Sequence, residues 1–234
     1  MKLTSFIPLL LSAASFVGAG PTLVKRANPK GIDVSNHQPH VDFSKVKKNG
    51  LSFVYIKATE GTTYIDPNFN THYPAATKAG LIRGGYHFAR PGSSSGAAQA
   101  KFFLAHGGGW SKDGITLPGA LDLEAPQKGA QCYGLSPSAM VSWIKDFSHT
   151  YHSKTGRYPV LYTTTSWWKS CTGNSASFGK TNPLWIAHWS SSIGTLPAGW
   201  SHSTFWQYAK SGPNPGDQDS FNGDLAGLKR LAHG

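Results

Sequence analysis

Short apolar segments alternate with amphipathic ones along the chain from about residue 31 onward. The apolar segments are rich in β-branched and aromatic residues, which is typical of strands. We expect seven strands, at residues 31–35, 51–59, 81–89, 120–124, 159–164, 184–189 and 204–209. Between them, apolar residues at spacings of three and four and capping residues predict helices at 43–48, 67–79, 97–106, 137–151 and 222–231, with Asp66 as the cap of the second helix.

The alternation of strands and helices predicts the fold class. It is typical of a mostly parallel sheet with right-handed crossovers. Seven or eight such strands predict closure into an α/β barrel, a single TIM-barrel-like domain at residues 27–234. In such barrels catalytic residues lie at the C-terminal ends of the strands, so the side chains there are candidates for a functional site.

The first twenty residues predict a signal peptide. Lys2 supplies a positive charge, residues 6–11 begin an apolar stretch, and Val17-Gly18-Ala19 offers a small-residue cleavage site. The apolar stretch is too short to span a membrane. We therefore expect a secreted, extracellular protein.

Residues 21–26 are interpreted as a short pro-segment. They end in Lys25-Arg26, which is the kind of site that a dibasic protease cleaves; the alternative is that this pair is only a basic loop. Cleavage there would leave a chain of 208 residues that begins at Ala27, and would lower the formal net charge from +11 to +8 because three basic and no acidic residues are removed.

The remaining positive charge favours a polyanionic partner. Bacterial envelopes are anionic, whereas the chain has neither a run of Lys and Arg nor a nucleic-acid-binding motif. The alternative is a basic surface that only keeps the protein soluble. We expect neither nucleic acid nor membrane as a partner, and a monomer.

Two cysteines, Cys132 and Cys171, are present. In an exported chain an even pair most often forms a disulfide bond. The alternative, a pair of metal-ligating thiols, lacks a second pair at zinc-like spacing. We expect the disulfide.

One predicted strand carries two carboxylates, Asp122 and Glu124, within an otherwise apolar run. Alternate residues of a strand point to the same face, so the two side chains would lie side by side, about 6.6 Å apart along the strand. The chain has only eleven acidic residues, so the placement of two of them together favours catalysis. The alternative is a strand end at which both side chains simply reach water.

Other predicted strands also end in acidic or aromatic residues. Aromatic rings stack on sugar faces, and carboxylates bind hydroxyls and act as acids and bases, so their convergence favours a sugar site. Taken singly, each aromatic residue could instead belong to the core. The candidates for substrate contact are Asp33, Glu60, Tyr86, Phe88, Tyr162, Trp185, Trp206 and Asp217.

Seven segments in order, from about residue 30 to 231, resemble the glycoside hydrolase family 25 muramidases, the Chalaropsis-type lysozymes. The segments are Gly31-Ile32-Asp33-Val34-Ser35, Ile56-Lys57-Ala58-Thr59-Glu60-Gly61, Gly85-Tyr86-His87-Phe88-Ala89-Arg90-Pro91, Leu121-Asp122-Leu123-Glu124, Leu184-Trp185-Ile186-Ala187, Phe205-Trp206-Gln207-Tyr208 and Asp217-Gln218-Asp219-Ser220-Phe221-Asn222-Gly223. The resemblance implies a modified, flattened β/α barrel that hydrolyses the β-1,4 bond between N-acetylmuramic acid and N-acetylglucosamine in bacterial peptidoglycan.

The resemblance also implies roles. Glu124 matches the general acid, and Asp122 matches the carboxylate that assists the N-acetyl group of the substrate. Asp33 and Asp217 match two further acidic residues that line the site, while Asp219 falls where the family often has asparagine. Glu60 matches a family glutamate that we expect to bind or to order structure.

Three hypotheses remain open. The first is hydrolysis by this pair with retention of the anomeric configuration, which needs no metal or cofactor. The second is a metal-dependent deacetylase of cell-wall sugars that uses Asp33, His37 and His87. The third is a barrel that binds carbohydrate without catalysis, against which the intact pair of Asp122 and Glu124 argues.

Overall fold

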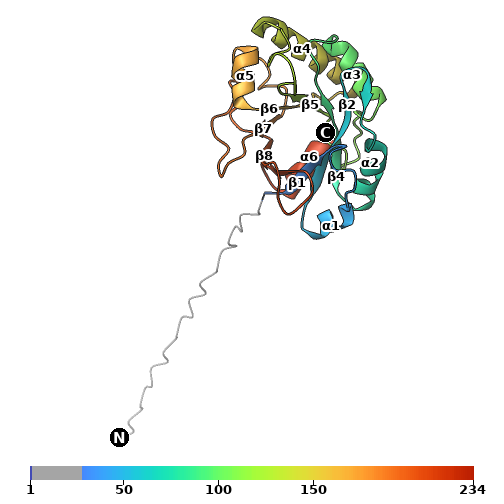
Figure 1. Cartoon of the computed structure of the whole chain (residues 1–234). Helices are drawn as coiled ribbons and strands as arrows, with labels where there is room; N and C mark the ends of the chain where they lie inside the picture. Colours follow the sequence, from blue (N-terminus) through green and yellow to red (C-terminus); the bar gives the residue numbers. More distant parts are fainter. Residues whose placement is uncertain (2–27) are drawn as a thin grey trace.

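Within the part of the chain that the computed structural model describes (Met1 and residues 28–234), eight strands close into a barrel (Figure 1). Their order around it is β1-β9-β8-β7-β6-β5-β4-β2, and β1 pairs back onto β2. Only β9 runs antiparallel to its neighbours among these strands. The strands are β1 (Lys30–Val34), β2 (Phe53–Glu60), β4 (Ile82–Phe88), β5 (Ala120–Leu123), β6 (Val160–Thr163), β7 (Leu184–Ala187), β8 (Phe205–Ala209) and β9 (Asp217–Phe221), with a short β3 (Tyr64–Ile65) added antiparallel to β2.

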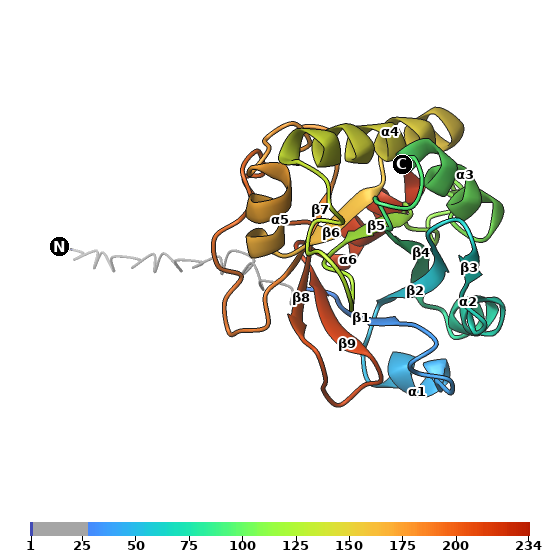
Figure 2. The same cartoon turned by 45° about the horizontal axis from the view of Figure 1, so that its top comes forward.

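Helices pack against much of the outside of the barrel, while loops lie beside β8 and β9, as Figure 2 shows. They are α1 (Phe43–Lys48), α2 (Phe69–Lys78), α3 (Gly96–Ala105), α4 (Pro137–Thr155), α5 (Thr165–Thr172) and α6 (Leu225–His233). The outward faces of the strands and the inner faces of the helices share one apolar cluster, which includes Ile56, Leu121 and Phe147. This burial of apolar area is the main source of stability for such a two-layer arrangement.

A second apolar cluster fills the barrel interior and includes Phe53, Phe205 and Leu228. Phe53 and Phe205 lie at the starts of β2 and β8, while Leu228 comes from α6. Helix α6 therefore closes the N-terminal end of the barrel, which leaves the C-terminal strand ends as the open end.

Stacked aromatic rings form the middle layer of the interior. The rings of Tyr55 and Trp185 lie 4.8 Å apart, and the Tyr55 hydroxyl donates to the carbonyl of Pro118 at 2.9 Å. Tyr55 leaves no room for a side chain on the neighbouring strand, because a Cβ at Gly84 would lie 2.5 Å from its ring. This layer is the rigid floor beneath the open end.

The expected fold class is confirmed, and all seven expected strands are present. Three elements were not predicted: the short strand β3, strand β9 and helix α5. The prediction that Asp66 caps the second helix was wrong, since α2 begins at Phe69 and the Asp66 carboxylate instead accepts the backbone N–H groups of Asn36 and Asn68.

The expected disulfide between Cys132 and Cys171 is present and joins the loop after β5 to helix α5. In the described part of the chain, no helix has the length and apolar character that a membrane crossing requires. The predicted signal peptide, pro-segment and new start at Ala27 lie outside the described residues.

Candidate active site

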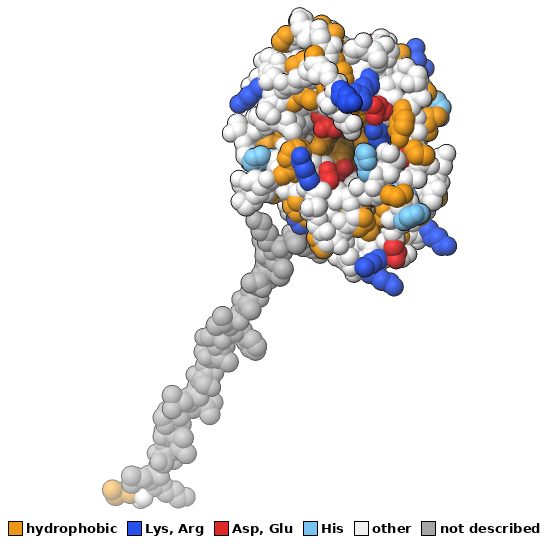
Figure 3. Space-filling view, in the orientation of Figure 1, with side chains coloured by type: hydrophobic (Ala, Val, Ile, Leu, Met, Phe, Trp, Pro, Cys, Tyr) orange, Lys and Arg blue, Asp and Glu red, His pale blue; other side chains and the backbone are white. Residues whose placement is uncertain are grey.

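A pocket of about 330 Å³ opens at the C-terminal ends of the strands. Figure 3 shows a hollow in this face, with acidic side chains gathered around it and basic ones near them. Nearly all the residues singled out from the sequence line it: Asp33, Glu60, Tyr86, Phe88, Asp122, Glu124, Tyr162, Trp185 and Asp217.

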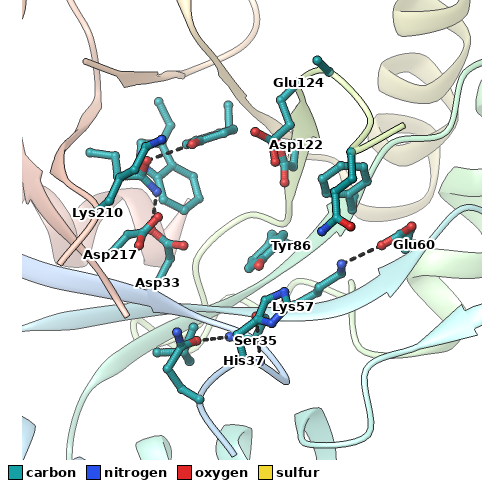
Figure 4. A pocket seen from close by; sticks show the side chains of 18 of the residues that line it. Asp33, Ser35, His37, Lys57, Glu60, Tyr86, Asp122, Glu124, Lys210 and Asp217 are labelled. Carbon is teal, nitrogen blue, oxygen red and sulfur yellow. Dashed lines mark hydrogen bonds and ion pairs between the residues drawn. The ribbon is translucent and has the colours of Figure 1, made fainter. Parts of the chain in front are cut away.

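The pair Asp122 and Glu124 lies on one side of the pocket (Figure 4). Asp122 is the third residue of β5, and Glu124 follows directly after the strand. Asp122 is only 7% exposed, and its Oδ1 is buried without a hydrogen-bond partner among the described residues. An unpartnered buried oxygen is costly for the protein alone, so it is available to a donor on a bound molecule.

Asp33 and Asp217 form a second acidic pair, which Figure 4 shows on the other side of the pocket. They are direct partners in the antiparallel pairing of β1 with β9. The four carboxyl groups thus lie at or directly beside the ends of three strands, β1, β5 and β9, which are far apart in the sequence and meet because the barrel closes.

Burial raises the pKa of all four carboxyl groups. For Asp33, burial and the negative charge of Asp217 raise the pKa to about 7, and for Asp217 burial raises it to about 6. Burial, then the charge of Glu124, raises the pKa of Asp122 well above its ordinary value. Burial and the charge of Asp217 also raise the pKa of Glu124. The pocket therefore retains protons near neutral pH, which general acid catalysis requires.

Gln207 connects the two sides of the pocket. Its Nε2 donates to Asp33 Oδ2 at 2.7 Å, while its Oε1 accepts from the Tyr162 hydroxyl at 2.8 Å and from Trp189 Nε1 at 2.9 Å. The amide is thereby held in one orientation, and it fixes the Asp33 carboxylate.

Trp206 is the one predicted sugar-contacting residue that does not line this pocket. It precedes Gln207 on β8, and successive side chains of a strand point to opposite faces, so the inward position belongs to Gln207. The Trp206 indole N–H instead donates to the carbonyl of His188.

A basic side of the pocket was not predicted. Lys57, on β2, donates to Glu60 Oε2 at 2.7 Å, and Arg90 Nε donates to Glu60 Oε1 at 2.8 Å. Although burial alone would raise the pKa of Glu60, these two partners hold it below its ordinary value. Glu60 is thus an ion-paired residue of the pocket wall.

Lys210 and Trp189 were also not predicted. Both line the pocket, and Lys210 Nζ lies 3.7 Å from the centre of the exposed Trp189 ring. They lie in the loops that follow β7 and β8, and a single sequence does not indicate whether the side chains of such loops point into the pocket. Lys57, by contrast, is a charged residue that interrupts the apolar run of β2, and that anomaly could have identified it.

The deacetylase hypothesis required Asp33, His37 and His87 to share a metal. His87 is fully buried, and its two ring nitrogens bond to Thr59 Oγ1 and Gln99 Oε1. Burial lowers its pKa to about 4. Because both nitrogens are already used, His87 is not free to bind a metal with the other two residues, so the structure contradicts this ligand set.

A β/α barrel with paired carboxyl groups and aromatic walls in one open pocket has the architecture of a sugar-cleaving hydrolase. The family model for glycosyl hydrolases family 25 matches residues 32–217. The chain belongs to this family, as its sequence motifs implied, and is a glycoside hydrolase.

Similar proteins support the assignment. An N,O-diacetylmuramidase of Arthroderma benhamiae is 50% identical, with all of both chains covered. An N,O-diacetylmuramidase of Chalaropsis is 53% identical over 88% of this chain and 99% of its own. The structure of a family GH25 lysozyme from Aspergillus fumigatus is 55% identical, covers 89% of this chain and 100% of its own, and superposes with a TM-score of 0.88.

Proposed function

We propose that the protein is a secreted muramidase that hydrolyses the β-1,4 bond between N-acetylmuramic acid and N-acetylglucosamine in bacterial peptidoglycan. The observation that carries the proposal is the pair Asp122 and Glu124 in a pocket that also holds Asp33, Asp217 and aromatic rings. The muramidase names of relatives about half identical over nearly their whole length support the substrate.

The mechanism that fits this geometry is assistance by the substrate. Oδ1 of Asp122 accepts the N–H of the 2-acetamido group, and this bond favours the ionised form of Asp122. The proton of the pair then remains on Glu124, which donates it to the leaving oxygen. As the glycosidic bond breaks, the acetamido oxygen forms a bond to the anomeric carbon.

Water completes the reaction. Glu124, now ionised, removes a proton from a water molecule, which attacks the anomeric carbon and displaces the acetamido oxygen. Two displacements at one carbon retain the anomeric configuration. Both carboxyl groups project from the end of β5 toward the same region of the pocket, which supports a helper role for Asp122 over the role of a base on the opposite face.

The remaining residues are assigned to binding. Asp33 and Asp217 lie on the opposite side of the pocket, where they can accept sugar hydroxyls. Tyr86, Phe88 and Tyr162 offer apolar ring surface, on which a pyranose face packs favourably. Trp185 lines the floor.

Fragments from purified peptidoglycan test the proposal. Mass spectrometry should find new reducing ends on N-acetylmuramic acid, and proton NMR of the first product should find the β anomer. Reducing ends on N-acetylglucosamine, or release of acetate alone, would contradict the bond assignment. An inverted anomer would rule out substrate assistance, and a trapped ester on Asp122 would replace it with a covalent enzyme intermediate. The Glu124→Gln protein serves as the matched inactive control.

Secretion rests on the N-terminal sequence. We propose that cleavage after Lys25-Arg26 yields a mature protein that begins at Ala27. Intact-mass analysis of the protein from culture medium should give that start. A start at Gly20 or Pro21 would remove the pro-segment from the proposal while leaving the signal peptide.

A further inference from the structure

Asp219 is a carboxyl group that the mechanism above does not use. It lies two residues after Asp217 on β9, so both side chains point to the barrel interior. Asp219 is fully buried, and its Oδ1 accepts the indole N–H of Trp185 at 2.9 Å. Its Oδ2 has no hydrogen-bond partner among the described residues. In the pairing of β1 with β9, Asp33 lies opposite Asp217 and Gly31 lies opposite Asp219, so Asp219 is the diagonal neighbour of Asp33 on the inward face. This neighbourhood makes the Asp33 carboxyl the partner for Asp219, and a hydrogen bond between the two acts on the pKa of each.

Contact between these two carboxyl groups requires a proton. Two adjacent carboxylates in a buried site cannot both ionise without a large energetic cost. Among the described residues, four ionisable groups interact electrostatically with Asp219. They are Asp33 on β1, Asp217 on β9, Tyr55 on β2 and Tyr208 on β8. None of them supplies a positive charge. The hydrogen bond from the Trp185 indole N–H favours an ionised Asp219, but burial and the charge of Asp33 oppose it and leave the pKa well above its ordinary value.

The environment of each group decides which one keeps the proton. Asp219 has no exposed surface, whereas Asp33 lines the pocket and accepts a hydrogen bond from Gln207. Water and the Gln207 amide stabilise a negative charge on Asp33, and neither reaches Asp219. The proton is therefore assigned to Asp219, and Oδ2 is the oxygen available to carry it, because Oδ1 already accepts from Trp185.

We propose that Asp219 is a positioning residue, a neutral carboxylic acid that donates a hydrogen bond to Asp33 and holds its carboxylate toward the sugar. Asp33 is then fixed from two sides, by Asp219 and by Gln207. In support, burial raises the pKa of Asp219 well above its ordinary value, and the hydrogen bond from Asp219 lowers the pKa of Asp33 against the effects of burial and Asp217. The effect on turnover rests on the proposed function, whereas the location of the proton does not.

The test compares two replacements of similar size. In Asp219→Asn the amide keeps an oxygen for Trp185 and an N–H for Asp33, so we expect turnover of peptidoglycan within about threefold of the wild type. In Asp219→Leu the donor is lost, and we expect kcat to fall by about tenfold or more, the effect of losing one hydrogen bond to a charged group. The pH at which activity is half lost on the acid side should also rise, because Asp33 loses a donor that favours its charged form.

Ser220→Ala is the matched control, since Ser220 is a buried polar residue of the same strand that does not line the pocket. It should change neither kcat nor the pH profile. Equal losses in Asp219→Asn and Asp219→Leu would overturn the proposal, because a donor would then not matter. An unchanged pH profile in a folded Asp219→Leu protein would also overturn the proposal.

A direct observation of the proton keeps the proposal testable if the leucine variant does not fold. The infrared difference spectrum between wild type and Asp219→Asn at neutral pH should contain the carbonyl band of one protonated carboxylic acid. Its absence would overturn the proposal. This measurement uses no substrate, so failure of the muramidase assignment and failure of the proton assignment are distinguished.

Discussion

Lys57 and Glu60 form an ion pair in the wall of the pocket, with 2.7 Å between Nζ and Oε2. Both are largely shielded from solvent, and Arg90 binds the other oxygen of Glu60. The positive charge of Lys57 lowers the pKa of Asp122 and of Glu124, which burial otherwise raises. The ion pair thereby holds in place a charge that sets the titration of the two proposed catalytic groups.

Replacing Lys57 by methionine should therefore shift the pH dependence of hydrolysis. Without the positive charge, the pKa values of Asp122 and Glu124 both rise, so both limbs of the profile of kcat against pH should move to higher pH. Lys101→Met, an exposed replacement on α3, is the matched control and should leave the profile in place. Unchanged limbs in a folded Lys57→Met protein would show that Lys57 does not act on this pair.

The two proposed catalytic carboxyl groups should differ in their response to the leaving group. Glu124→Gln removes the acid and should lower kcat on peptidoglycan by about a hundredfold to ten-thousandfold. A substrate with an activated aryl leaving group needs no acid, so the loss should shrink. Asp122→Asn should leave some activity on both substrates, because the acetamido oxygen of the substrate remains. Asp42→Asn, at an exposed helix cap where asparagine serves equally well, is the control. If the activity of Asp122→Asn, rather than that of Glu124→Gln, recovered on the activated substrate, Asp122 would be the general acid and Glu124 the helper.

The strands of the barrel could be predicted because most of them are apolar and buried on both faces, which gives the sequence a clear signal. Strand β9 was missed because its residues Asp217, Gln218, Asp219 and Ser220 are polar. They tolerate burial only through partners distant in the sequence, such as Trp185 for Asp219. Helix α5 was missed because it begins directly after β6, with Thr164 as its cap and no glycine or proline between the strand and the helix.

The acidic part of the site was predictable for a physical reason. Parallel strands present their C-terminal ends at the same edge, so acidic residues at several strand ends had to converge. Whether Trp206 or Gln207 lines the pocket depends on which face of β8 points inward. The inward face is fixed by the pairing of β8 with β7 and β9, and the register of β8 with β9 shifts between Gln207 and Ala209. This register cannot be read from a single sequence.

The disulfide between Cys132 and Cys171 should stabilise the fold without shaping the pocket. It closes a loop of 39 residues, and in the chain-entropy model such a loop contributes about 4 kcal/mol to the free energy of unfolding. Trp167 Nε1 also donates to the carbonyl of Gln131, so a second contact holds the same loop. Urea unfolding of the reduced and oxidised proteins should differ by roughly that amount, while both hydrolyse peptidoglycan. Equal midpoints would contradict the prediction.

The buried carboxyl groups should make the protein less stable near neutral pH than it would be without them. Asp122 has a higher pKa in the folded state than the ordinary value of 3.8 that it has in the unfolded chain. Between these two values the folded protein binds more protons, so the free energy of unfolding falls as the pH rises. Each pH unit over which the two states differ by one proton costs about 1.4 kcal/mol. Asparagine does not titrate, so it removes this cost.

Asp122→Asn should therefore raise the melting temperature at about pH 7, and the gain should shrink toward about pH 2.8, one unit below the ordinary pKa of 3.8, where the aspartate is almost fully protonated in both states. Asp122 is buried and its Oδ1 has no partner among the described residues, so the amide breaks no hydrogen bond there. The exposed Asp42→Asn replacement supplies the control and should show no such pH-dependent gain. Calorimetry of both variants and the wild type across this pH range measures the difference. A gain of equal size at both pH values would mean that the replacement acts through packing and that the Asp122 charge carries no cost to stability.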